Sequence, residues 1–424
     1  MTFTRWAPAL LCMLTMLCSG CSLIQDPQSY MRKPKLPEDK ASLNHVIEQA
    51  IPAGASILRP KRSDDPASIY IKDLDNDGNP EAVVFYKTQD AIKGMLWTRS
   101  GDTWTLVSEM TGDGYELDSL QFEDLTNDGR LEIVAGYSGG IRLSMGLVIY
   151  HLDGGKLTTL YQSPYNEMII DDLNQDQQKD ITLVTMERNV SSKITTFQYN
   201  GKDFQPIGSV PLDPYVNGYY NIAAGYVADS IRGLLLDAGV GAHSSTTQLV
   251  RFDGGQLVKA FPDNKLPFRS GSALSGDINQ DGIMEISIDM APKGSESEAY
   301  AYTPWITEYY RWDGQEGLSK TPLYRRYYDY LNGFYLEIPA EWKDAFGVKR
   351  TENTHRFYFT DTDTTIFEWE TIPKESWDSG DIQGKVIGRT DKTVTVLHLP
   401  SDNSKYADNF HSVTELQREE NSDE

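Results

Sequence analysis

The stretch Asp73-Leu-Asp75-Asn-Asp77-Gly78-Asn-Pro-Glu81 decides the fold, because three later stretches repeat its pattern. The repeats are Asp124-Leu-Thr126-Asn-Asp128-Gly129-Arg-Leu-Glu132, Asp172-Leu-Asn174-Gln-Asp176-Gln177-Gln-Lys-Asp180 and Asp277-Ile-Asn279-Gln-Asp281-Gly282-Ile-Met-Glu285. We call the four stretches loops 1 to 4 in chain order. Each places oxygen-bearing side chains at positions 1, 3, 5 and 9 around a sharp turn at position 6, a pattern typical of a cage for a hard divalent cation. The implied ion is calcium.

The predicted calcium ligands are the side chains at positions 1, 3, 5 and 9 and the backbone carbonyl at position 7 of each loop. In chain order they belong to Asp73, Asp75, Asp77, Asn79, Glu81, Asp124, Thr126, Asp128, Arg130, Glu132, Asp172, Asn174, Asp176, Gln178, Asp180, Asp277, Asn279, Asp281, Ile283 and Glu285. Crowded carboxylates repel one another, so calcium is expected to stabilise the loops rather than to take part in chemistry. Loop 2 departs from the pattern at Thr126, and loop 3 departs from it at Gln177, where glycine is preferred.

The loops start at positions 73, 124, 172 and 277, which are separated by 51, 48 and 105 residues. The last interval is close to twice the others, so a unit without the acidic pattern is expected near residue 226. A β-branched run follows each loop, which predicts strands and disfavours the flanking helices of an EF-hand. Asp-Gly, Asn-Gly or similar hairpin signals recur near residues 101, 154, 201, 254 and 314. Four strands in about 50 residues are typical of a β-propeller blade, and a linear stack of sheets is the competing architecture.

The acidic loops in phase with hairpin signals resemble FG-GAP or VCBS repeats, which form the blades of integrin α-subunit propellers and occur in many bacterial exported proteins. The resemblance covers residues 66–322. It implies a mainly β fold with a propeller-like array of about five four-stranded blades. Residues 323–424 lack acidic loops and show alternating strand patterns, followed by Tyr406, Phe410, Val413 and Leu416 at helical spacing. They predict a small C-terminal α+β domain.

The N-terminal segment predicts export. Residues 1–20 contain Arg5 and an apolar run from Trp6 to Leu17, and a run of about 12 residues is too short to span a bilayer as a helix. Leu17-Cys18-Ser19-Gly20-Cys21 resembles a bacterial lipobox, although leucine is preferred where Cys18 stands. The resemblance implies a lipid on Cys21 and anchoring to the outer face of a bacterial membrane, and a plain cleaved signal peptide is the alternative. Residues 21–65 are expected to form a tether and a short helix.

Composition restricts the classes of function. The formal charge is −23, from 62 acidic and 39 basic residues, which argues against nucleic acid as a partner. The three cysteines lie at positions 12, 18 and 21, so no disulfide is expected within the folded domains. The chain shows no H-E-x-x-H, G-x-S-x-G or phosphate-loop motif. We therefore expect no catalytic residues and no enzyme; the alternative is a calcium-dependent polysaccharide lyase or hydrolase on a propeller scaffold.

A ligand face is expected on the rim opposite the acidic loops, where the connections between second and third strands gather. Loops carried by a rigid scaffold commonly hold recognition residues. The candidates on this face are Tyr137, His243 and Trp305. The predicted function is that of a monomeric, membrane-anchored binding or adhesion scaffold whose ligand is a cell-wall glycan or a protein.

Overall fold

The computed structural model describes residues 38–413 except 64, 66, 102, 113, 140–144, 379, 381 and 382. The predicted signal peptide, Cys21 and most of the tether lie outside the described residues, as does Leu416. Within the described part of the chain, no helix combines the length and apolar character needed to cross a membrane.

The fold is mainly β, as predicted, and its first four sheets are antiparallel meanders of consecutive strands. The first contains β2 (Ile69–Lys72), β3 (Glu81–Lys87), β4 (Ile92–Ser100) and β5 (Thr103–Gly112), with β1 (Ser56–Ile57) also paired to β3. The second contains β6 (Glu116–Glu123), β7 (Glu132–Ser138), β8 (Met145–Asp153) and β9 (Lys156–Tyr165). The third contains β10 (Glu167–Asp171), β11 (Asp180–Glu187), β12 (Ser191–Tyr199) and β13 (Phe204–Pro211).

The fourth sheet contains β14 (Gly218–Ala228), β15 (Ile231–Gly239), β16 (Ser244–Asp253) and β17 (Gln256–Lys259), and β18 (Phe268–Ser270) also pairs with β16. Loops 1 to 3 join the first strand of a meander to the second. In the fourth sheet a tight hairpin turn at Asp229 and Ser230 takes that place, because β14 pairs with β15 up to Ala228 and Ile231. This unit therefore lacks an acidic loop, in line with the sequence spacing. Loop 4 leads into β19 (Ile286–Met290) of the next sheet.

Two further antiparallel sheets complete the described chain. One has the order β19, β20 (Ile306–Tyr310), β21 (Tyr324–Asp329), β22 (Phe334–Glu337) and β28 (Phe410–Ser412). The other has the order β23 (Phe346–Arg350), β24 (Thr354–Phe359), β25 (Thr364–Pro373), β27 (Thr393–His398) and β26 (Lys385–Arg389), and the short helix α4 (Lys374–Asp378) follows β25. The predicted domain limit at residues 322 and 323 falls between β20 and β21, which pair with each other.

The C-terminal helix expected from Tyr406, Phe410 and Val413 is corrected by the structure. Residues Ser401–Asn409 form a 3-10 helix, and the chain then pairs as strand β28 with β22. Tyr406 and Phe410 still pack into one aromatic core with Trp342 and Trp369. Helical spacing therefore identified Tyr406 and Phe410 as side chains that face a core, but backbone pairing with a sheet edge replaced the last turns of the expected helix.

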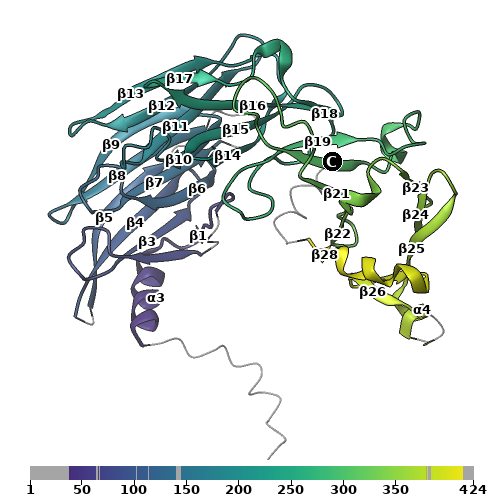
Figure 1. The fold of residues 1–424 in the computed structure, drawn as a ribbon. Helices are drawn as coiled ribbons and strands as arrows, with labels where there is room; N and C mark the ends of the chain where they lie inside the picture. Colours follow the sequence, from purple (N-terminus) through teal and green to yellow (C-terminus); the bar gives the residue numbers. More distant parts are fainter. Residues whose placement is uncertain are drawn as a thin grey trace, which may run out of the picture.

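The sheets pack face to face in chain order, and Figure 1 shows them as a row that bends into an arch. Each junction is an apolar cluster with side chains from two neighbouring sheets; for example, Phe85 and Ile133 join the first and second sheets. Helix α3 (Glu38–Ala50) covers the other face of the first sheet, where Leu43 and Ile47 pack on Val84 and other apolar residues of that sheet. None of the sheets that the described residues form closes into a barrel.

The packing of α3 predicts a measurable contribution to stability. Leu43 is 1% exposed, so Leu43→Ala removes buried methyl groups and leaves a cavity against the first sheet. We expect the free energy of unfolding to fall by about 2–5 kcal/mol in denaturant titrations. Glu48→Ala, an exposed change on the same helix, is the matched control and should leave it within about 0.5 kcal/mol. Equal, small effects of both changes would show that α3 does not cap the first sheet.

Candidate metal centre and neighbouring sites

The four acidic loops share one backbone arrangement. In loop 1, the Asp73 carboxylate accepts hydrogen bonds from the backbone N–H groups of Asp77 at 3.2 Å and Gly78 at 3.0 Å. The aspartates at position 1 of the other loops, Asp124, Asp172 and Asp277, accept the equivalent pair. These bonds fold the loop tightly around its first carboxylate.

Positive φ angles accompany this fold at positions 4 and 6 of every loop. Position 6 is glycine in three loops, where the left-handed region costs no Cβ strain. In loop 3, Gln177 adopts a φ of 73° at this position. The third loop therefore keeps the common conformation despite its departure from the sequence pattern, at a local cost of about 1–2 kcal/mol.

The acid at position 9 is buried in every loop and accepts a hydrogen bond from the backbone N–H of position 2. The distances are 2.9 Å for Glu81 and Leu74, 2.7 Å for Glu132 and Leu125, 3.1 Å for Asp180 and Leu173, and 3.2 Å for Glu285 and Ile278. Burial raises the pKa of all four carboxyl groups, and that of Asp180 to about 7. Each loop therefore holds a carboxylate whose charge needs compensation.

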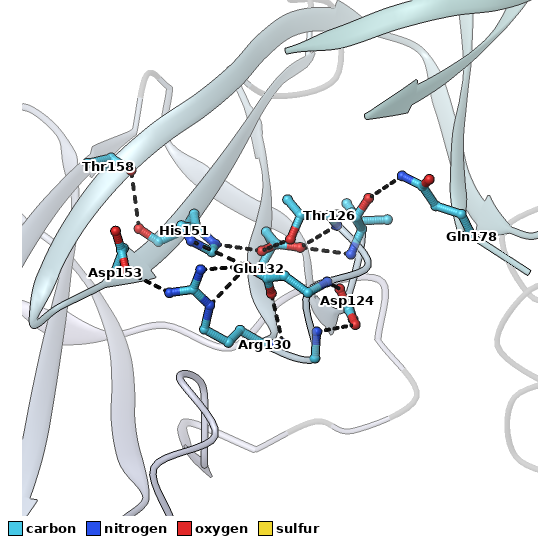
Figure 2. A network of polar contacts seen from close by, with 11 residues as sticks. Asp124, Thr126, Arg130, Glu132, His151, Asp153, Thr158 and Gln178 are labelled. Atoms are coloured by element: carbon cyan, nitrogen blue, oxygen red, sulfur yellow. Dashed lines mark hydrogen bonds and ion pairs between the residues drawn. The ribbon is translucent and has the colours of Figure 1, made fainter. Parts of the chain in front are cut away.

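Basic side chains lie against the carboxylates of loops 2 and 4. In loop 2, shown in Figure 2, the Arg130 guanidinium binds Asp128 at 2.6 and 2.9 Å, and His151 Nδ1 lies 2.7 Å from Glu132 Oε1. In loop 4, the Arg311 guanidinium binds both Asp281 and Glu285. The sequence pattern assigned only a backbone carbonyl to Arg130 and did not identify His151 as a partner of the loop. An arginine at position 7 of an acidic loop is the signal that could have revealed the first of these pairs.

In loop 3, neutral side-chain amides donate hydrogen bonds to the carboxylate at position 5. The Gln198 side-chain amide donates to Asp176 at 2.6 Å, and the Asn174 amide donates to the same carboxylate at 3.0 Å. The Gln178 side chain instead donates to the backbone carbonyl of Leu125 at 3.2 Å, which ties loop 3 to loop 2. Among the described residues, the Oδ1 atom of Asp180 has no hydrogen-bond partner although it is buried.

Loop 1 differs from the other three because three of its carboxylates converge, and no basic side chain among the described residues pairs with them. Asp73, Asp75 and Glu81 each offer an oxygen, and these oxygens lie within 4.8 Å of one another. No ion pair among the described residues involves this loop, and Glu81 Oε1 accepts only the Thr98 hydroxyl at 3.2 Å among the side chains that the structure describes. Hard oxygen donors at this separation fit a divalent cation such as calcium. This cluster could therefore hold a metal ion.

The residues predicted for the ligand face do not all lie together. Tyr137 is 1% exposed, and its hydroxyl meets that of Tyr150 at 3.2 Å inside the first core cluster, so it is corrected to a core residue. His243 is exposed and stacks on Tyr300, with ring centroids 4.2 Å apart. Tyr300 in turn contacts Trp305, whose indole N–H donates to the Tyr300 carbonyl at 3.1 Å. We call these three residues the aromatic cluster.

Comparisons with known proteins give no family. No family model matches the chain, and no curated protein matches it. Among solved structures, the Bacillus licheniformis rhamnogalacturonan lyase PL11 gives a TM-score of 0.33 at 12% identity, over 74% of this chain and 64% of that chain. Rhamnogalacturonan lyase YesW gives 0.34 at 12% identity, over 73% and 69%. Chaetomium thermophilum Sqt1, bound to the N-terminus of the ribosomal protein L10, gives 0.32 at 10% identity, over 78% and 97%.

These findings correct one expectation from the sequence. The absence of familiar catalytic motifs led to the prediction that the protein is not an enzyme, and the presence of polysaccharide lyases among the similar structures contradicts it. We therefore withdraw that prediction.

The difference between the loops predicts that calcium acts mainly through loop 1. At a calcium concentration a hundredfold above Kd, binding to the folded state adds about 2.7 kcal/mol. Asp75→Asn should remove most of the calcium-dependent rise in Tm, because it weakens the only cluster of three convergent carboxylates found in the described residues. Asp281→Asn should remove less, since Arg311 already neutralises Asp281.

Melting curves recorded with calcium and with chelator measure both effects. Asp229→Ala, in the hairpin turn of the fourth sheet, is the control for a change outside any acidic loop. An equal loss of the calcium-dependent rise in Asp75→Asn and Asp229→Ala would contradict the assignment.

Proposed function

We propose that this protein is a calcium-stabilised, polysaccharide-binding scaffold of the FG-GAP or VCBS type. The observation that carries the proposal is the convergence of Asp73, Asp75 and Glu81 in loop 1 without an internal cation. Extracellular calcium modules bind with a Kd of about 10⁻⁴ to 10⁻³ M, so such a loop fills only where calcium is abundant, outside the cell. Export with a lipid on Cys21 and anchoring at a bacterial membrane are part of the proposal.

The proposed arrangement is propeller-like but open. Support comes from consecutive meanders that pack face to face, with loops 1 to 3 each joining a first strand to a second. Support for an open row comes from α3, which occupies the face of the first sheet against which a last blade would close a ring. The resemblance to FG-GAP or VCBS repeats accounts for the acidic loops and hairpins together.

Polysaccharide binding is proposed because of the aromatic cluster. Trp305 and Tyr300 are half-buried, His243 is exposed, and the neighbouring Tyr302 is 71% exposed. The indole hydrogen bond to the Tyr300 carbonyl fixes the orientation of Trp305 before any ligand arrives. Rigid aromatic side chains give large contact areas at a low entropic cost, which suits the apolar faces of sugar rings.

A second candidate function is cleavage of the bound polysaccharide by a lyase or hydrolase activity. The supporting observation is that groups able to transfer protons surround the aromatic cluster. A Cβ placed on Gly271 would lie 3.1 Å from both Asp289 Oδ2 and the Tyr300 hydroxyl, so these two groups flank the same backbone position. With His243 stacked on Tyr300, a carboxyl, a phenol and an imidazole are gathered near one surface.

Binding is tested with soluble wall polysaccharides and measured by affinity electrophoresis in calcium. We expect Trp305→Ala and His243→Ala to weaken binding by about tenfold or more, since they remove central aromatic contacts. Tyr115→Ala, which removes an exposed tyrosine of the β5–β6 connection, is the matched control and should bind as the unchanged protein does. Full retention of binding by both cluster variants would exclude the aromatic cluster as the ligand site.

Cleavage is tested by incubating the same polysaccharides with the protein and following new reducing or unsaturated ends with time. A lyase produces ultraviolet-absorbing unsaturated ends, a hydrolase produces reducing ends alone, and a binder saturates without product. If an activity is present, His243→Ala should lower its rate at least tenfold, because imidazole is the group best suited to proton transfer near neutral pH. An activity that His243→Ala leaves unchanged would place the chemistry elsewhere.

A further inference from the structure

A pocket of about 460 Å³ lies on the acidic-loop rim, between loop 3 and the β14–β15 hairpin. Its polar lining comes from Asp171 at the end of β10, from Asp172, Gln175 and Lys179 in loop 3, and from Tyr226 and Arg232 on the hairpin. The volume is within the range of about 300–1,000 Å³ found for sites of small ligands. None of the proposals above uses this pocket.

The sequence explains why one wall of the pocket is a hairpin. The fourth unit lacks the acidic pattern, so β14 and β15 stay paired up to a two-residue turn and present Tyr226 opposite Arg232. The Arg232 guanidinium lies 4.8 Å from the centre of the Tyr226 ring and donates to Asp171 Oδ1 at 2.7 Å. Arg232 is therefore held between a ring and a carboxylate, while Tyr226 remains 39% exposed.

The charges of the lining balance. Asp171 pairs with Arg232, and Lys179 pairs with Glu123 just outside the pocket. The Asp172 carboxylate accepts the N–H groups of Asp176 and Gln177. Two acids and two bases thus give the lining no net charge, and the chain as a whole carries −23. Neither a polyanion nor a free cation is favoured by this arrangement.

The lining offers hydrogen-bond donors and acceptors side by side. Arginine and lysine only donate, ionised carboxylates only accept, and the Gln175 amide does both. A hydroxyl group both donates and accepts, so a ligand with several hydroxyls can satisfy such a lining without a charge of its own. Tyr226 adds an exposed aromatic edge for the apolar part of the ligand.

We propose that this pocket binds an uncharged sugar unit of a polysaccharide, with Tyr226 as the apolar contact and Arg232, Lys179 and Gln175 as hydrogen-bonding partners. The inference rests on the proposed polysaccharide binding and adds a site and a ligand class to it. The pocket and the aromatic cluster are separate sites, because Arg232 is near the start of β15 and His243 lies just beyond its end. At about 3.3 Å per residue, nine residues of strand place these ends roughly 30 Å apart.

The experiment measures binding of defined oligosaccharides to the full protein in calcium by titration calorimetry. The probes are neutral hexamers of glucose, mannose, galactose and N-acetylglucosamine, and a galacturonate hexamer is the anionic comparison. We expect at least one neutral hexamer to bind, and Tyr226→Ala to weaken it by about tenfold, the loss of one aromatic contact. Lys179→Gln, an exposed change, should weaken it by a smaller factor, and Tyr226→Phe should retain most of the affinity.

Matched controls are Tyr115→Ala and Lys202→Gln, which alter an exposed tyrosine and an exposed hairpin lysine far along the chain from the pocket residues. If the melting curve of the Tyr226→Ala variant shows that it is misfolded, binding by the Lys179→Gln variant tests the proposal instead. The Lys179 side chain is on the surface, so its replacement leaves the fold intact. If Lys179→Gln and Tyr226→Ala bind as the unchanged protein does and Trp305→Ala loses binding, the pocket is not the binding site. The proposed polysaccharide binding would then still hold. Binding of the galacturonate hexamer alone would contradict the proposal that the ligand is uncharged. If no hexamer binds and wall polysaccharides also fail to bind, both the pocket proposal and the proposed polysaccharide binding are contradicted.

Discussion

The structure depends on one electrostatic constraint, which is that every acidic loop buries a carboxylate at position 9. Glu81, Glu132, Asp180 and Glu285 anchor their loops by accepting the backbone N–H of position 2. This bond fixes the loop to the start of the second strand, or to the residue just before β19. An uncompensated buried charge costs several kcal/mol, so each loop also needs a partner for its carboxylates.

Basic groups meet the carboxylates of loops 2 and 4, amides meet those of loop 3, and the loops also bind one another along the rim. Leu131 N–H donates to the Leu74 carbonyl at 2.8 Å between loops 2 and 1, and Gln178 joins loops 3 and 2. Arg232 joins the β14–β15 hairpin to the end of β10, and Met284 N–H donates to the Tyr226 carbonyl at 2.7 Å between loop 4 and that hairpin. The rim is thus a continuous hydrogen-bonded series, and guanidinium, imidazole or amide groups contact carboxylates in every acidic loop after the first.

Sequence periodicity predicted the backbone better than the side-chain partners. The strands expected after the loops coincide with β3, β7, β11 and β19, because loop and hairpin signals are local and repeat at a constant period. The partners could not be predicted in the same way, since Arg311 follows Asp281 by 30 residues and meets it only when β19 and β20 pair. The burial of Tyr137 was missed for a related reason: alternation along β7 is lost where both faces of a strand are covered by neighbouring sheets.

In each of loops 1 to 3, one side chain that meets the carboxylates comes from the third strand of the loop's own sheet. His151 on β8 contacts Glu132 of loop 2, and Gln198 on β12 contacts Asp176 of loop 3, whereas β4 brings the Thr98 hydroxyl to Glu81 of loop 1. Loop 1 is at the end of the row, where the adjoining cover is α3, whose packed residues are apolar and offer no cation. A mobile ion is the remaining source of positive charge for Asp73, Asp75 and Glu81. Because Leu74 and Leu131 join this loop to loop 2, an ion held there would also order the first member of the hydrogen-bonded rim.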